Sequence, residues 1–119
     1  MKRTILIIAG VVLLGGIIHC GIGLSPLFFG RLTLNHLWFT AAGMSLILIA
    51  FINYLVVNIK SWQISFFVVG HITNILGSIL LGAILCFLPA PHIALLFLLL
   101  VAETVLVVLL HSRAVRTAL

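Results

Sequence analysis

Four long apolar runs, separated by short polar breaks, constrain the fold of this chain more than any other feature of its sequence. A membrane-spanning helix needs about 20 consecutive, mostly apolar residues, and each of the four runs meets that length. The expected spans are residues 4–24, 37–58, 63–88 and 92–111.

The composition excludes a soluble fold. Only 6% of the 119 residues are charged and 65% are hydrophobic, whereas about a quarter of the residues of a soluble domain are charged. A chain of this length cannot bury so much apolar surface in a core of its own, so the expected partner of its surface is the lipid bilayer. The net charge of +5 comes from basic residues that flank the runs, which argues against a nucleic-acid partner.

The connections between the runs predict the architecture. Pro89 and Pro91 end a helix between the last two spans, and the segment NIKSWQ forms a short turn between the middle two. Short connections make consecutive helices antiparallel neighbours. We therefore expect an all-α, integral membrane four-helix up-down bundle that forms a single domain over residues 1–119.

The basic residues predict the orientation. Cytoplasmic flanks of membrane spans are enriched in Lys and Arg. With both termini in the cytoplasm, only Arg31 lies outside, and five basic residues lie inside: Lys2, Arg3, Lys60, Arg113 and Arg116. The prediction is an N-in/C-in, multi-pass protein of a bacterial cytoplasmic (inner) membrane, with Trp38 and Trp62 at the two lipid boundaries.

The opening segment, MKRTILIIAGVVLLGGIIHCGIGLSP, also has features of a secretion signal. A lipoprotein signal needs a small residue just before its cysteine, and His19 precedes Cys20 here. Gly21 and Gly23 would allow ordinary cleavage. The basic C-terminus returns to the cytoplasm only if the number of spans is even. We therefore expect this segment to be the first helix of the bundle.

Polar residues at membrane depth are the candidate site, because each is costly there unless it is paired or hydrated. At a rise of roughly 1.5 Å per residue, His71 and Glu103 lie at matching depth on adjacent helices. Asn74 is one turn from His71 on the same helix face. One hypothesis is a proton-exchange or cation-binding site formed by Glu103 and His71 and oriented by Asn74. The alternative is a polar clamp that only fixes helix packing.

Three histidines near the outer boundary form a second candidate set, His19, His36 and His92. Imidazoles that converge on one face can bind zinc or copper, and two of them can hold a haem. The alternative is that they cap helices at the membrane interface. Glycines beside His19 favour close helix packing and would also leave a slot for a flat ligand such as a quinone.

The function classes follow from these residues. The chain has no phosphate loop, no H-E-x-x-H motif and no aspartate, so an enzyme is not expected and no cofactor is required. The first hypothesis is a proton- or cation-linked transporter or a small-ligand-binding membrane protein. The second is a structural or accessory subunit, and the third a haem- or metal-binding redox subunit. A transport pathway through so small a bundle favours a homo-oligomer or a larger membrane complex.

Two resemblances accompany these hypotheses. In length and span number the chain resembles the small multidrug-resistance transporters, which dimerise around a carboxylate in their first helix, whereas here Glu103 lies in the last span. The segments GIIHCGIG and HLWFTAAG resemble small four-span bacterial membrane proteins that are loosely DoxX-like. The second resemblance implies a membrane location and no particular activity.

Overall fold

The structure is a computed structural model that describes residues 1–59 and 64–118. Lys60 and Trp62, on which part of the orientation argument rests, lie outside the described residues. The described part is all-helical and contains no strand. Its helices are α1 (Lys2–Leu24), α2 (Pro26–Phe29), α3 (Leu34–Asn58), α4 (Ile64–Phe87) and α5 (Pro91–Ala118).

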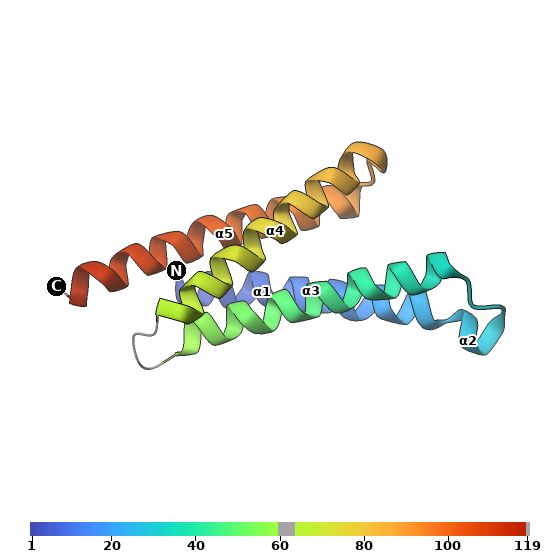
Figure 1. Ribbon diagram of the computed structural model, residues 1–119, viewed down its shortest axis with the longest axis horizontal. Helices are drawn as coiled ribbons and strands as arrows, with labels where there is room; N and C mark the ends of the chain where they lie inside the picture. Colours follow the sequence, from blue (N-terminus) through green and yellow to red (C-terminus); the bar gives the residue numbers. More distant parts are fainter. Residues whose placement is uncertain (60–63, 119) are drawn as a thin grey trace.

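Four of these helices are long and apolar enough to cross a membrane, which confirms the predicted fold class. The segments that meet this criterion are Lys2–Phe29, Leu34–Asn58, Ile64–Phe87 and Pro91–Arg116. The chain is therefore a small multi-pass membrane protein. Both termini lie at one end of the bundle, here called the terminal end, and α2 lies at the other, the α2 end (Figure 1).

The helix boundaries follow local chemistry. Proline fits the first turn of a helix, where its missing N–H is not needed, and Pro91 is the first residue of α5. The segment between the first two spans, expected to be a plain connection, contains the short helix α2. The last helix runs to Ala118, beyond the predicted limit at residue 111, because a helix can continue past the apolar core with basic residues in its final turns.

The first two long helices pack with their backbones in contact. A Cβ atom added to Gly16 in α1 would lie 2.7 Å from the Gly43 carbonyl oxygen in α3, and one added to Gly43 would lie 2.7 Å from the Gly16 carbonyl oxygen. Only glycine permits this approach on both sides. The structure thus confirms that glycines bring helices close together, through Gly16 and Gly43.

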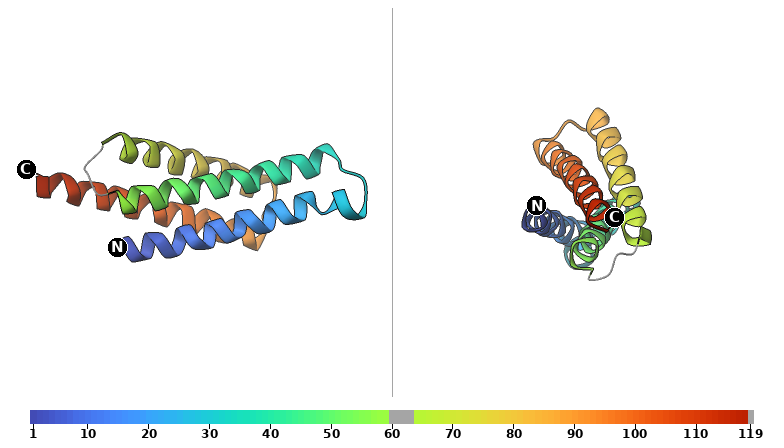
Figure 2. Two further views of the ribbon diagram at one scale, coloured as in Figure 1. Left: turned by 90° about the horizontal axis from the view of Figure 1, so that it is seen from below. Right: turned by 90° about the vertical axis from the view of Figure 1, so that its left-hand side faces the viewer.

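The second pair of helices is inclined to the first. The α4–α5 hairpin diverges from the α1–α3 hairpin toward the α2 end (Figure 1), and the end-on view in Figure 2 shows the angle between them. The buried residues of α4 are Phe67, Gly70 and Asn74, all in its first half. At the terminal end, all four long helices contribute to one core of Ile5, Val56, Val57, Phe67, Val107 and Leu110. The bundle is therefore closed at the terminal end and open at the α2 end.

Candidate functional site

A buried polar layer lies where the two hairpins meet. Just on the α2 side of this layer, helices α3, α4 and α5 are in close contact at Gly77. A Cβ atom added to Gly77 would lie 2.8 Å from Leu100 and 2.9 Å from Ile49. One helical turn closer to the terminal end, the same three helices carry Asn53 on α3, Asn74 on α4 and Glu103 on α5. All three side chains have a relative exposure of 0%. The layer therefore places the only acidic side chain of the chain beside two carboxamides.

The side-chain amides of Asn53 and Asn74 satisfy each other's hydrogen-bonding capacity. Asn53 Nδ2 donates to Asn74 Oδ1 at 2.8 Å, and Asn74 Nδ2 donates to Asn53 Oδ1 at 2.9 Å. This reciprocal pair joins α3 of one hairpin to α4 of the other. Interhelical hydrogen bonds of this kind stabilise membrane bundles by about 1 kcal/mol each, so the pair is well suited to fix the position of α4.

Glu103 is not satisfied in the same way. The Asn53 side chain lies beside its carboxyl group, yet neither Oε1 nor Oε2 makes a hydrogen bond of ordinary geometry within the described residues. A buried carboxyl group without such bonds is costly. Its polar neighbours therefore do not compensate for its burial.

His71 lies next to this layer but bonds elsewhere. His71 Nε2 is 2.8 Å from His111 Nδ1, and the two rings stack with centroids 5.1 Å apart. His111 also stacks on Phe67 at 4.6 Å. The hypothesis joined His71 to Glu103, whereas the hydrogen bond in the structure joins His71 to His111, two turns further along α5.

The other ring nitrogen of His71 is buried without a partner. Among the described residues, the buried side-chain polar atoms that lack a hydrogen bond are His71 Nδ1, Ser78 Oγ and the two Glu103 oxygens. They come from two adjacent helices, α4 and α5, in neighbouring turns. Unsatisfied polar atoms are rare in protein interiors, so their concentration at one interface distinguishes this region from the rest of the bundle.

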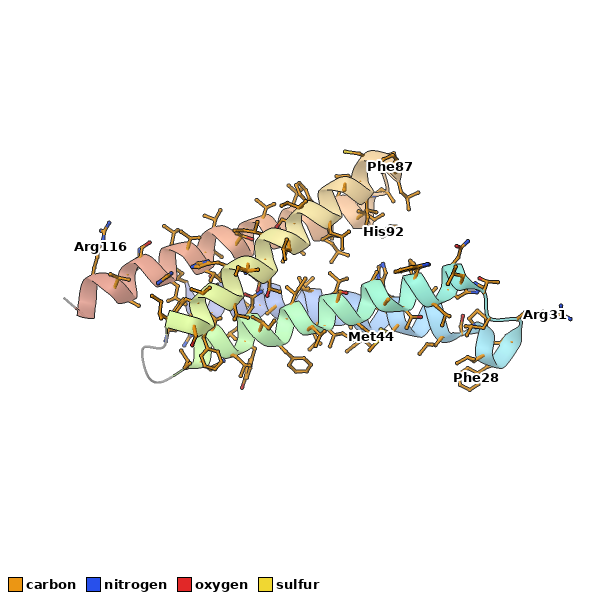
Figure 3. All side chains as sticks on the ribbon, in the orientation of Figure 1. Phe28, Arg31, Met44, Phe87, His92 and Arg116 are labelled. Atoms are coloured by element: carbon orange, nitrogen blue, oxygen red, sulfur yellow. The ribbon has the colours of Figure 1, made fainter. Side chains whose placement is uncertain are left out.

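The histidines of the α2 end separate into two groups. The rings of His19 and His92 have centroids 6.4 Å apart, and Figure 3 shows His92 at the start of α5. His36 lies instead at the start of α3, where its Nδ1 accepts from the Thr33 backbone N–H at 3.2 Å. In the described part of the chain, no three His, Cys, Asp or Glu side chains are close enough to hold a metal ion.

Two residues of the site were not predicted from the sequence. Neither Asn53 nor His111 was among the predicted site residues. A usable signal was present for His111, because it follows Glu103 by eight residues and so lies on the same helix face. Asn53 had no such signal, since only the contact between the two hairpins brings it to Asn74 and Glu103.

Comparison with known proteins gives no relative. No protein-family model matches the chain, and neither a curated protein nor a solved structure is similar enough to it to indicate a relationship. The geometry of the polar layer and its surroundings is therefore the basis for a proposed function.

Proposed function

We propose that this protein is a small proton- or cation-linked transporter in which Glu103 is the ion-binding group. The observation that carries the proposal is the position of Glu103, fully buried at the junction of the hairpins with neither carboxyl oxygen hydrogen-bonded. Ionisable residues inside membrane spans are functional by default because their cost must be offset.

The charge of an ionised Glu103 supports this role. An ionised carboxylate at this depth needs a compensating positive charge. No basic side chain lies among its hydrogen-bonding or ionic partners in the described residues. The charge is then compensated by a bound proton or a small cation, and release of that ion leaves a high-energy state. A group with these properties can couple ion binding to a change in helix packing.

The surrounding packing supports access to Glu103 from the α2 end. Cavities lie on the α2 side of the Ile49–Gly77–Leu100 level, and one of them is lined by Ile49 and Gly77. Glu103 lies on the other side of that level. The close contacts at Gly77 separate Glu103 from the cavity. A small movement of α4, which the Asn53–Asn74 pair links to α3, would connect them.

The test uses the fact that Glu103 is the only acidic side chain. Infrared difference spectra of the protein in lipid, recorded as pH is changed, should contain a protonated side-chain carboxyl band. That band should be absent from Glu103→Gln, which keeps the size and hydrogen-bonding capacity of the side chain. If no carboxyl band in the wild-type spectrum changed with pH, proton exchange at Glu103 would be ruled out. The same measurement with added monovalent cations tests whether Glu103 binds a cation instead.

A second function is supported by the Asn53–Asn74 pair. In a structural or accessory subunit, the polar layer would only fix the arrangement of the hairpins, as the reciprocal hydrogen bonds of this pair do. Glu103→Gln would then leave both the assembly and the activity of the partner complex unchanged. A carboxyl band that changes with pH in the wild type favours the transporter, and a band that does not change favours the structural subunit.

The proposal includes the location and orientation, an N-in/C-in protein of a bacterial cytoplasmic membrane. Both termini lie at one end of the bundle, and Arg31 lies at the other (Figure 3). A chain without its two native cysteines should react with a membrane-impermeant maleimide at Arg31→Cys in intact spheroplasts. Arg116→Cys should react only after the membrane is opened. The opposite pattern would reverse the orientation.

Assembly into a homo-oligomer is part of the same proposal. The exposed surface of the described helices is largely apolar, and the interior at the polar layer is filled by side chains from all three contacting helices. A dimer would provide further walls for a pathway. The mass of the protein–detergent complex by light scattering should correspond to two or more chains. A monomer that retains ion binding would remove this requirement.

A further inference from the structure

A second cluster, at the α2 end, is separate from the Glu103 layer and consists of His19, Phe39 and His92. The His19 ring stacks on Phe39 with centroids 4.4 Å apart. His92 comes from α5 across the opening between the hairpins, and its ring centroid lies 6.4 Å from that of His19. The cluster thus brings two imidazoles and a phenyl ring from three helices to one place.

Two cavities meet at this cluster. The smaller has a volume of about 150 Å³ and reaches between α3 and α4 as far as Ile49 and Gly77. The larger has a volume of about 630 Å³ and lies between α1 and α5. Both are lined by His19, Phe39, Leu88, His92 and Leu96.

The lining determines what the cavities can hold. Apart from the two histidines, the only polar side chain is Ser45, whose hydroxyl already donates to the Ala41 carbonyl oxygen at 2.9 Å. An apolar cavity of about 150 Å³ in a protein interior can accept one benzene-sized ring. The occupant is therefore apolar, has a ring that fits the smaller cavity, and carries a polar group only where the histidines are.

The hydrogen bonding of the histidines specifies that polar group. His19 Nδ1 lies 3.1 Å from the Gly15 carbonyl oxygen, and since a carbonyl only accepts, the ring donates from Nδ1. The neutral ring then leaves Nε2 as an acceptor. A ligand that meets His19 must supply a hydrogen-bond donor, whereas a ketone or an ether cannot.

The separation of the two rings is compatible with a single bridging oxygen atom. At ordinary hydrogen-bond lengths, an oxygen bonded to a nitrogen of each ring would hold the centroids 6.4 Å apart if the angle at the oxygen were roughly 110°. A hydroxyl oxygen prefers that angle. It would donate to His19 Nε2 and accept from the N–H of His92.

We propose that the His19–His92 cavity binds a membrane-soluble compound with an aromatic hydroxyl group, of the phenol and quinol class. The aromatic ring lies in the smaller cavity against the stacked His19 and Phe39 rings. Its hydroxyl group bridges the two imidazoles, and its apolar tail, carried on the ring carbon next to the hydroxyl, follows the larger cavity between α1 and α5. This site does not depend on ion binding by Glu103.

The experiment compares 2-nonylphenol, whose tail is next to the hydroxyl, with its methyl ether, 2-nonylanisole, in which a methyl group replaces the O–H donor hydrogen. Calorimetric titration of the full chain in lipid nanodiscs, corrected with empty nanodiscs, should show one saturable site per chain for the phenol. The ether should bind about 5–10-fold more weakly, the factor that corresponds to one lost hydrogen bond. Equal affinities would overturn the proposal and leave a cavity for hydrocarbon chains only.

Variants locate the site. His19→Phe and His92→Phe should each reduce phenol affinity about 5–10-fold. His19→Phe should leave ether affinity unchanged, because the ether has no O–H to donate to His19. His36→Phe is the matched control, since His36 is at the same end but lines neither cavity, and it should bind the phenol like the wild type. Unchanged phenol binding in both cavity variants would overturn the proposal. The comparison of the two ligands on wild-type protein remains decisive if a variant does not fold.

The same titration with Glu103→Gln separates this proposal from the proposed function. Phenol binding should be unchanged in that variant, because Glu103 lines neither cavity. Loss of the carboxyl signal with retained phenol binding is the expected combination. A phenol site that disappears with Glu103 would contradict the independence of the two sites.

Discussion

Asn53 and Asn74 hydrogen-bond to each other twice, at 2.8 and 2.9 Å, from two helices of different hairpins and with both side chains fully buried. Their pairing is the main polar connection between the α1–α3 hairpin and the α4–α5 hairpin in the described structure. It lies at the last level at which α4 is buried, just before the hairpins diverge toward the α2 end. The pair therefore links the two hairpins just before they diverge.

The first prediction concerns this pair. Asn74→Leu leaves the Asn53 amide buried without its partner, so the free energy of unfolding should fall by about 1–3 kcal/mol. Asn53→Leu should have a similar effect. The double variant removes both polar groups and should recover much of the loss. Thermal unfolding in detergent, followed by circular dichroism, measures all three, and additive losses in the double variant would contradict a direct pair.

The second prediction concerns Glu103. Because the carboxyl oxygens have no hydrogen bond to lose, Glu103→Leu should raise the free energy of unfolding by about 1–3 kcal/mol while it abolishes proton binding. If Glu103 and His71 formed a stabilising clamp, Glu103→Leu would instead lower the free energy of unfolding. A lower melting temperature for this variant would show that Glu103 contributes to stability and would favour the structural reading.

The third prediction concerns the close contact of α1 and α3. A side chain at Gly16 would collide with the Gly43 carbonyl oxygen and with Ile47. Gly16→Leu should therefore force the helices apart and cost several kcal/mol, of the order seen for severe overpacking. Gly10→Leu is the matched control on the same helix, since nothing lies within 4 Å of a Cβ atom there. Equal effects of the two substitutions would contradict the close packing.

The fourth prediction concerns His71 and His111. His111→Phe retains a ring against Phe67 but removes the partner of His71 Nε2. The free energy of unfolding should therefore fall by about 1–2 kcal/mol. His111→Asn can place an amide group near the position of Nδ1, so its free energy of unfolding should fall by less than that of His111→Phe. If the asparagine variant is the less stable of the two, stacking rather than the hydrogen bond holds this pair together. The measurement is again thermal unfolding in detergent.

The sequence determined that lipid surrounds the helices and that four of them span the membrane. Runs of apolar residues of membrane-spanning length leave no other arrangement, because a backbone in lipid must satisfy its own hydrogen bonds within a helix. Pro91 and the polar breaks determined where the helices begin and end. Glu103 could also be identified from the sequence, because it is the only acidic residue and lies within an apolar run.

Only the tertiary structure decided which polar residues meet. The depth estimate from helical rise placed His71 opposite Glu103, but it contains no information on the rotation of each helix about its axis or on the tilt between hairpins. Those quantities depend on packing at Gly16 and Gly43 and on the Asn53–Asn74 contact. They bring Asn53 to the acidic side chain, turn His71 toward His111, and leave His19 and His92 facing a cavity while His36 caps a helix.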